Sequence, residues 1–152
     1  MASTAETYRS AAKENLGRAQ ALFEGEEYFL AHYLAGLAVE CHLRAYLRRR
    51  TNVFNSRHDL RELAAESGYY QIVPAAAAGE FSARFGLLNL RWRSSHRFYS
   101  ERQLLDYMNE IGAEFSVKGA RTDGSRWKNL SRTVLNLAHI IINQGEAKWE
   151  ST

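Results

Sequence analysis

The sequence has little cysteine, little proline and no long apolar run. Its single cysteine, Cys41, cannot form a disulfide within the chain, which favours a reducing compartment and predicts the cytoplasm. The single proline leaves helices almost uninterrupted, and β-branched runs are scarce. No apolar run approaches the roughly 20 residues that span a bilayer, and the opening residues are too polar for a secretory signal. We therefore expect no membrane segment.

The composition is that of one ordinary globular domain. The chain has 152 residues, of which 45% are hydrophobic, so it can bury a real core. No Pro/Gly/Ser-rich linker divides it and no internal repeat is visible, so we predict a single domain over residues 1–152. A formal net charge of +3 permits an anionic partner without demanding one.

Apolar residues recur at helical spacing through most of the chain, which predicts an all-α, up-and-down bundle of four main helices plus one or two short ones. We expect the first helix to begin at a Ser3–Glu6 capping box, and a later one at a Ser100–Gln103 box. The final helix should be capped by Asp123 or Ser125 and stop at Gly145, and the tail after it should be mobile apart from Trp149. The other expected elements are helices over 28–50, 56–67 and 74–90, with an extended connector at 69–73.

The rest of the chain is organised around the long helix expected at 28–50. A projection at about 100° per residue predicts a buried stripe of Leu30, Tyr33, Leu34, Leu37, Cys41 and Ala45. Glu40 and Arg44 lie in or beside this stripe, one turn apart, where they can pair. The pair could sit at the edge of a core, which is the commoner situation, or line a polar cleft. Cys41 is then a small core residue rather than a nucleophile.

The segment LRWRSSHRFYS is the least helix-like stretch and carries the most chemistry. Arg91 and His96 could serve RNA cleavage without a metal, because an imidazole can move a proton near neutral pH and a guanidinium can hold phosphate oxygens. In a regular helix the two side chains would point about 140° apart. They could converge only if the segment bends, or if a second copy of the chain contributes its own motif.

Neighbouring residues could add affinity for a nucleic acid. Arg93 and Arg97 could bind phosphate, and Trp92, Phe98 and Tyr99 could stack on bases, since basic residues interleaved with aromatics suit single-stranded RNA. The alternative is structural. The aromatic rings would then be core anchors, and the arginines would neutralise carboxylates such as Glu40.

Three stretches together resemble a HEPN-domain protein: YFLAHYLAGLAVECHLRAYL, SRHDLRELAAESG and LNLRWRSSHRFYSERQLLDYM. The first resembles the family's second helix, with Glu40 followed by the basic residue Arg44. The second carries the His-x-Leu element, here His58 and Leu60, although a surface or packing role is the commoner one for a histidine such as His58. The third lies where one branch carries an Arg-aromatic pair, here Arg91 and Trp92.

The resemblance implies a helical bundle that usually dimerises and works near RNA or nucleotides. Many members are metal-independent ribonucleases of toxin–antitoxin or defence systems, and their nuclease motif is an Arg and a His four to six residues apart, as Arg91 and His96 are here. Trp92 stands where that motif commonly has a small polar residue. Other members are noncatalytic nucleotide-binding modules or nucleotidyltransferase partners.

Three hypotheses follow from the sequence. The chain could be a ribonuclease using Arg91 and His96 in one exposed cleft, a noncatalytic module that binds RNA or a nucleotide, or a structural dimerising bundle. The expected partners are RNA or a nucleotide, a nucleotidyltransferase or antitoxin protein, and a second copy. No cofactor is expected, and no metal, because His32 and His42 should point away from the stripe that holds Cys41.

Overall fold

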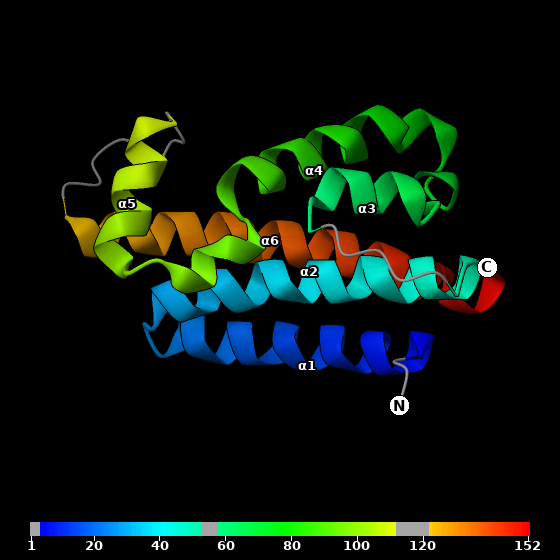
Figure 1. Cartoon of the computed structure of the whole chain (residues 1–152), viewed down its shortest axis with the longest axis horizontal. Helices are drawn as coiled ribbons and strands as arrows, with labels where there is room; N and C mark the ends of the chain where they lie inside the picture. Colours follow the sequence, from blue (N-terminus) through cyan, green and yellow to red (C-terminus); the bar gives the residue numbers. More distant parts are fainter. Residues whose placement is uncertain (1–3, 53–57, 112–121) are drawn as a thin grey trace.

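A computed structural model describes residues 4–52, 58–111 and 122–152, and these fold into helices (Figure 1). Within these residues there is no strand, so the prediction of an all-α bundle is confirmed. The α-helices are α1 (Ala5–Glu24), α2 (Tyr28–Arg50), α3 (Leu60–Glu66), α4 (Ala78–Arg91), α5 (Glu101–Glu110) and α6 (Asp123–Lys148). Short 3₁₀ helices lie at η1 (Tyr69–Gln71), η2 (Ala75–Ala77), η3 (Ser94–Phe98) and η4 (Trp149–Ser151).

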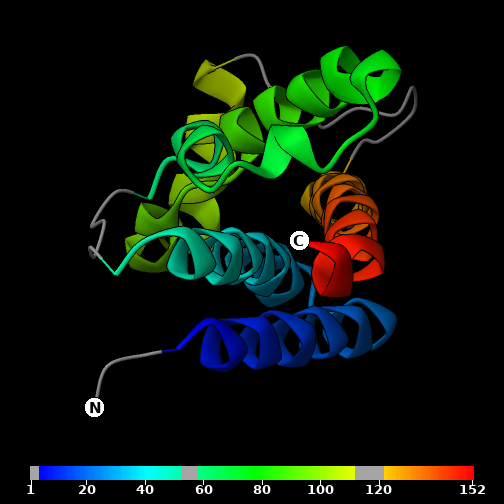
Figure 2. The same cartoon turned by 90° about the vertical axis from the view of Figure 1, so that its right-hand side faces the viewer.

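The helices are arranged in three layers. α1 forms one outer layer, α2 and α6 lie side by side in the middle, and α3 with α4 covers the opposite side (Figure 2). α1 runs antiparallel to α2, as the short turn between them predicts (Figure 1). Buried apolar side chains from all six α-helices form one cluster, in which α2 and α6 contribute the most residues.

α2 is the central helix, and the prediction of one buried stripe on it was wrong. Leu30 is exposed, and Leu34, Leu37 and Cys41 are only partly buried, whereas small residues such as Ala35 are fully buried. The stripe fails because α2 lies in the middle of the bundle, where α1, α3, α6 and η3 pack around it from different sides. A helix covered on several sides has no single apolar face, so projecting its sequence does not identify the core.

Helix starts follow local capping chemistry. The expected Ser100–Gln103 capping box is present at α5. α1 is capped by Thr4, whose hydroxyl accepts from the backbone N–H of Thr7, rather than by Ser3, which lies outside the described residues. α6 is likewise capped by Thr122 instead of Asp123 or Ser125. The start expected for the third helix, at residue 56, lies outside the described residues.

The connector after α3 is more compact than its sequence predicted. Gly68 ends the segment in the left-handed region, with φ of +74°, as expected of a helix stop. The residues that follow, Tyr69–Gln71, form a 3₁₀ turn rather than an extended connector, and Tyr69 is fully buried. Its hydroxyl donates to the carbonyl of Ile141 in α6, which holds the connector against the core.

The C-terminal part of the described chain is ordered against the core, contrary to the prediction of a stop at Gly145 and a mobile tail. α6 continues through Gly145, and Tyr46 donates to its carbonyl at 2.6 Å. Trp149 is buried, its indole N–H bonds Glu6, and the guanidinium of Arg49 lies 4.1 Å from the ring centre. Among the helices described, none is long and apolar enough to cross a membrane.

Candidate functional site

One face of α2 carries four buried residues at four-residue steps: His32, Gly36, Glu40 and Arg44. Such residues lie above one another on a helix, about 6 Å apart along its axis. The second half of the chain covers this face. Arg91, at the end of α4, and Trp92, which follows it, lie over His32 and Gly36. His58, just before the N-cap of α3, contacts Glu40 and Arg44.

The end of α4 is fixed to the first half of this face. The carbonyl of Arg91 accepts a hydrogen bond from His32 Nε2 at 2.9 Å. The indole of Trp92 is fully buried against Gly36, and its N–H donates to the carbonyl of Tyr33 at 3.0 Å. Trp92 is thus a core anchor, and the stacking on bases expected of it is wrong, because neither face of the ring is accessible.

His96 is the second buried anchor of this segment. Its Nδ1 accepts from the backbone N–H of Arg93 at 3.2 Å, and its ring stacks on His32 with 5.8 Å between centres. Tyr99 and Tyr107 contact the same ring. Burial, with the nearby His32 and Arg93 adding to it, lowers the pKa of His96 to about 3. The imidazole is therefore neutral at physiological pH and shielded from solvent.

The structure does not bring Arg91 and His96 together in one exposed cleft. The guanidinium of Arg91 lies at the surface, where it donates to the carbonyl of Leu87 in its own helix. His96 turns inward onto α2 and is about 1% exposed. The chain does bend after α4, as expected, but the bend buries the imidazole instead of presenting it.

The bend exposes cations and an aromatic ring to solvent. We call residues 91–99 the arginine turn. Arg93 and Arg97 are exposed, and the side chain of Phe98 is 71% exposed. The guanidinium of Arg97 lies 4.7 Å from the centre of the Phe98 ring, and Tyr99 is half-buried beside it. The buried anchors of the turn hold this exposed edge in place.

The second half of the α2 face carries a polar cluster. Glu40 Oε2 pairs with Arg44 Nε at 3.4 Å, and Glu40 Oε1 lies 2.9 Å from His58 Nδ1. The side chains of Glu40 and Arg44 are only 7% and 8% exposed, whereas that of His58 is 46% exposed. Glu40 and Arg44 are therefore a buried pair at the border between the core and the surface, covered by a half-exposed imidazole.

Asn89, in the last turn of α4, bonds the two residues that follow His58. Its side-chain amide donates to Asp59 at 3.1 Å, and its carbonyl oxygen accepts from the backbone N–H of Leu60 at 3.2 Å. Asn89 precedes Arg91 by two residues, and Asp59 follows His58 directly. The residue next to His58 is therefore tied to the last turn of α4, and both segments pack against the same face of α2.

The helical arrangement fits the HEPN resemblance drawn from the sequence. A comparison with protein families decides whether the chain belongs to that family. The model of the HEPN domain family matches residues 5–138, which is most of the chain. The chain belongs to the HEPN family. Comparisons with curated proteins and with solved structures give no match.

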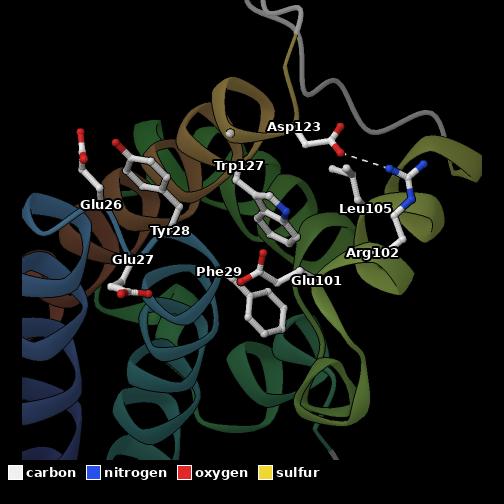
Figure 3. A pocket seen from close by; sticks show the side chains of 10 residues that line it. Glu26, Glu27, Tyr28, Phe29, Glu101, Arg102, Leu105, Asp123 and Trp127 are labelled. Atoms are coloured by element: carbon white, nitrogen blue, oxygen red, sulfur yellow. Dashed lines mark hydrogen bonds and ion pairs between the residues drawn. The ribbon is translucent and has the colours of Figure 1, made fainter.

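The HEPN domain has a pocket at the N-terminal end of α2, with a volume of about 530 Å³ (Figure 3). Its carboxylates come from the turn between α1 and α2 and from the starts of α5 and α6: Glu26, Glu27, Glu101 and Asp123. Its guanidinium, that of Arg102, pairs with Asp123 at 3.1 Å. The excess of negative charge makes this pocket unfavourable for a phosphate.

Two contacts were not foreseen from the sequence. His58 was a member of the His-x-Leu element, but its hydrogen bond to Glu40 joins residues 18 positions apart and had no local signal. His32 was considered only as a metal ligand, and it fixes the Arg91 carbonyl instead. In the described parts of the HEPN domain, no three His, Cys, Asp or Glu residues gather as a metal site. Burial raises the pKa of Cys41 to about 11, so its thiol is protonated at neutral pH.

Proposed function

We propose that this HEPN domain binds single-stranded RNA or a nucleotide through the arginine turn. The observation that carries the proposal is the exposed edge formed by Arg93, Arg97 and Phe98 on a turn whose other side is anchored in the core. Guanidinium groups bind phosphate oxygens, and an exposed aromatic ring offers a base a stacking surface. Because the turn is held by buried rings, little backbone freedom is lost on binding.

A hollow of about 420 Å³ beside the turn supports the same proposal. Phe98, Tyr99 and Tyr107 contribute aromatic rings to it, and Gln103, Asp106 and Glu110 contribute polar groups. A base stacked on the rings would place its edge near these side chains, where carboxylates can accept hydrogen bonds from amino groups. The cations for the phosphate would remain on the outer edge of the turn.

The geometry favours binding over cleavage by the pair Arg91 and His96. Proton transfer needs an imidazole within hydrogen-bond reach of the ligand, and His96 is buried and neutral. Cleavage by this pair, as in the toxin and defence ribonucleases, requires the turn to open. The homodimer and the nucleotidyltransferase or antitoxin partner that the resemblance implies stay predictions.

The proposal is tested by titrating short fluorescein-labelled single-stranded RNA with the protein and measuring anisotropy at several salt concentrations. The double variant Arg93→Ala/Arg97→Ala should weaken binding and reduce the slope of log K against log salt by about 1.4, since each phosphate contact to a single strand contributes roughly 0.7. The matched control, Arg18→Ala/Arg132→Ala, removes two exposed cations from α1 and α6. Equal affinity and slope in both double variants would contradict the proposal.

A further inference from the structure

We infer that the hollow beside the arginine turn selects guanine among the four RNA bases, with Asp106 and Gln103 recognising its Watson–Crick edge. This is the hollow of about 420 Å³ to which Phe98, Tyr99 and Tyr107 contribute their rings. The inference rests on the proposed function, because the arginine turn must hold the phosphate of the same nucleotide. It adds a base preference, which phosphate contacts and stacking do not supply by themselves.

The hollow adjoins a cation of the arginine turn. Phe98 lines the hollow, and the guanidinium of Arg97 lies 4.7 Å from the centre of its ring. α5 forms the other side, and the rings of Tyr99 and Tyr107, with 6.0 Å between their centres, connect that helix to the turn. A base stacked in the hollow is therefore next to a guanidinium that can bind its phosphate.

The first polar group of the hollow is the amide of Gln103, whose orientation is fixed by the capping box of α5. Its Oε1 accepts from the backbone N–H of Ser100 at 2.9 Å. That bond identifies the oxygen end of the amide, so the other end is Nε2, which carries two N–H donors and no acceptor. Nε2 makes no hydrogen bond to the described residues. Gln103 therefore offers a donor to a molecule in the hollow.

The second polar group is the carboxylate of Asp106, which pairs with Arg102 at 3.2 Å through Oδ1. An ionised carboxylate only accepts, and its two oxygens offer about four lone pairs, so this contact leaves room for two parallel donors. Asp106 follows Gln103 by three positions, which places the two on one face of α5 with Cβ atoms about 5–6 Å apart. A single base edge can reach both. Glu110 also lines the hollow, but it lies about 10 Å from Gln103 along the axis.

Guanine is the base whose edge matches this pair of groups. Its Watson–Crick edge presents the 2-amino group and N1–H as neighbouring donors, and O6 as an acceptor beside them. The two donors can bond the carboxylate of Asp106 side by side, and O6 can accept from Nε2 of Gln103. Uracil has a carbonyl on each side of its one N–H, and cytosine and adenine have one amino group beside an unprotonated ring nitrogen. Each would leave an acceptor facing the carboxylate without a hydrogen bond, which weakens binding.

The test measures anisotropy of fluorescein-labelled single-stranded RNA with the full chain. The RNA is a short run of uridines whose central nucleotide is guanosine, inosine, adenosine, cytidine or uridine. The wild type should bind the guanosine RNA at least about fivefold more tightly than the adenosine, cytidine and uridine RNAs, because a bidentate contact typically discriminates by about 5- to 150-fold. Inosine lacks only the 2-amino group, so its RNA should bind with intermediate affinity. This comparison needs no variant of the protein.

Asp106→Asn keeps the shape of the side chain and replaces one acceptor by a donor. This variant should bind the guanosine RNA at least about fivefold more weakly than the wild type does, and the uridine RNA equally well. The advantage of guanosine over inosine should disappear, because the 2-amino group has lost its partner. The matched control is Glu14→Gln, which changes an exposed carboxylate of α1 that pairs with Arg18 one turn away, as Asp106 pairs with Arg102. It should keep both differences.

Gln103→Glu tests the donor for O6. The capping box accepts glutamate as well as glutamine at this position, so α5 should still begin after Ser100. The new carboxylate offers no donor to O6, so the guanosine RNA should bind more weakly and its advantage over the adenosine RNA should shrink. Thermal melting of each variant identifies any that lose the fold.

The outcomes separate this inference from the proposed function. If the wild type binds all five RNAs with equal affinity, guanine selection is wrong and the binding function stands. A preference for adenosine, cytidine or uridine would overturn the inference in the same way. So would a folded Asp106→Asn protein that keeps the wild-type difference between guanosine and inosine. If the wild type binds none of the RNAs, the proposed function itself is wrong.

Discussion

The face of the Trp92 indole lies against the backbone of Gly36, so close that a Cβ at residue 36 would stand 2.2 Å from three ring carbons. Gly36→Ala should therefore displace the ring and lower the free energy of unfolding by about 1–3 kcal/mol, as other overpacked cores do. Gly17→Ala is the matched control, since no neighbouring atom lies within 4 Å of its added Cβ, and it should stabilise by about 0.5–1 kcal/mol. Urea unfolding measures both, and a Gly36→Ala protein as stable as the wild type would contradict the packing.

Acid should destabilise the fold through its buried histidines. Burial lowers the pKa of His32 and His42 to about 4 and that of His96 to about 3, from an ordinary value of 6.5. Above pH 6.5 all three are neutral in both states. Below it the unfolded chain binds protons that the folded chain does not, so stability falls as the pH drops toward 4, by up to about 1.4 kcal/mol per pH unit for each imidazole.

Replacing one of these histidines tests the sign of the effect. Neither ring nitrogen of His42 bonds a described residue, and aromatic rings surround it, so His42→Leu keeps an apolar filling. The stability of this variant, measured by urea unfolding between pH 7 and pH 4.5, should decline less steeply than that of the wild type. Parallel curves would show that His42 is not held neutral in the folded state.

Trp149 should contribute strongly to stability although it lies close to the end of the sequence. Its ring is buried between the guanidinium groups of Arg9 and Arg49, 5.0 and 4.1 Å from its centre, and packs edge-on against Tyr46. Trp149→Ala should cost about 3–5 kcal/mol. Thermal melting with Glu150→Ala as the control, an exposed neighbour, checks this. A melting temperature like that of the control would contradict the packing of Trp149 against the core.

Phe98 should matter to RNA and not to the fold. The side chain is 71% exposed, so Phe98→Ala removes little buried area and should leave the melting temperature unchanged. Loss of one stacking ring should weaken binding of single-stranded RNA by about 1–3 kcal/mol. Leu87→Ala truncates another exposed apolar side chain, on α4, and should bind RNA as the wild type does. Equal losses in the two variants would speak against stacking.

The sequence was sufficient to predict the helical class and the bounds of α2, because apolar spacing and capping residues act over a few positions. It failed where contacts between distant residues decide the outcome. Leu34 and Leu37 are apolar but only partly buried, whereas the alanines of α2 are fully buried. Other helices pack against several sides of α2, and its sequence alone does not show which side chains they cover. Gly145 does not end α6. Its role is to leave room for His42, because a Cβ at residue 145 would lie 2.0 Å from the imidazole Nε2.

Contacts between residues distant in the sequence also decide the arrangement of the candidate site. The Arg-x4-His spacing directed attention to residues 91–99, and the bend that the pair would need is present there. The direction of the bend depends on where Trp92 and His96 find apolar surroundings, and that is a property of α2 rather than of the segment. The bond between His58 and Glu40 likewise joins two helices whose approach no local pattern encodes.

The proposed function requires that the arginine turn be the surface that contacts an anionic ligand. The most direct measurement is a titration of ¹⁵N-labelled protein with short single-stranded RNA, followed by amide chemical shifts. The largest changes should fall in residues 93–99, with α1 unaffected, and they should diminish as salt is added. Changes confined to the acidic pocket around Glu101, or shifts absent from the arginine turn at saturating RNA, would contradict the account.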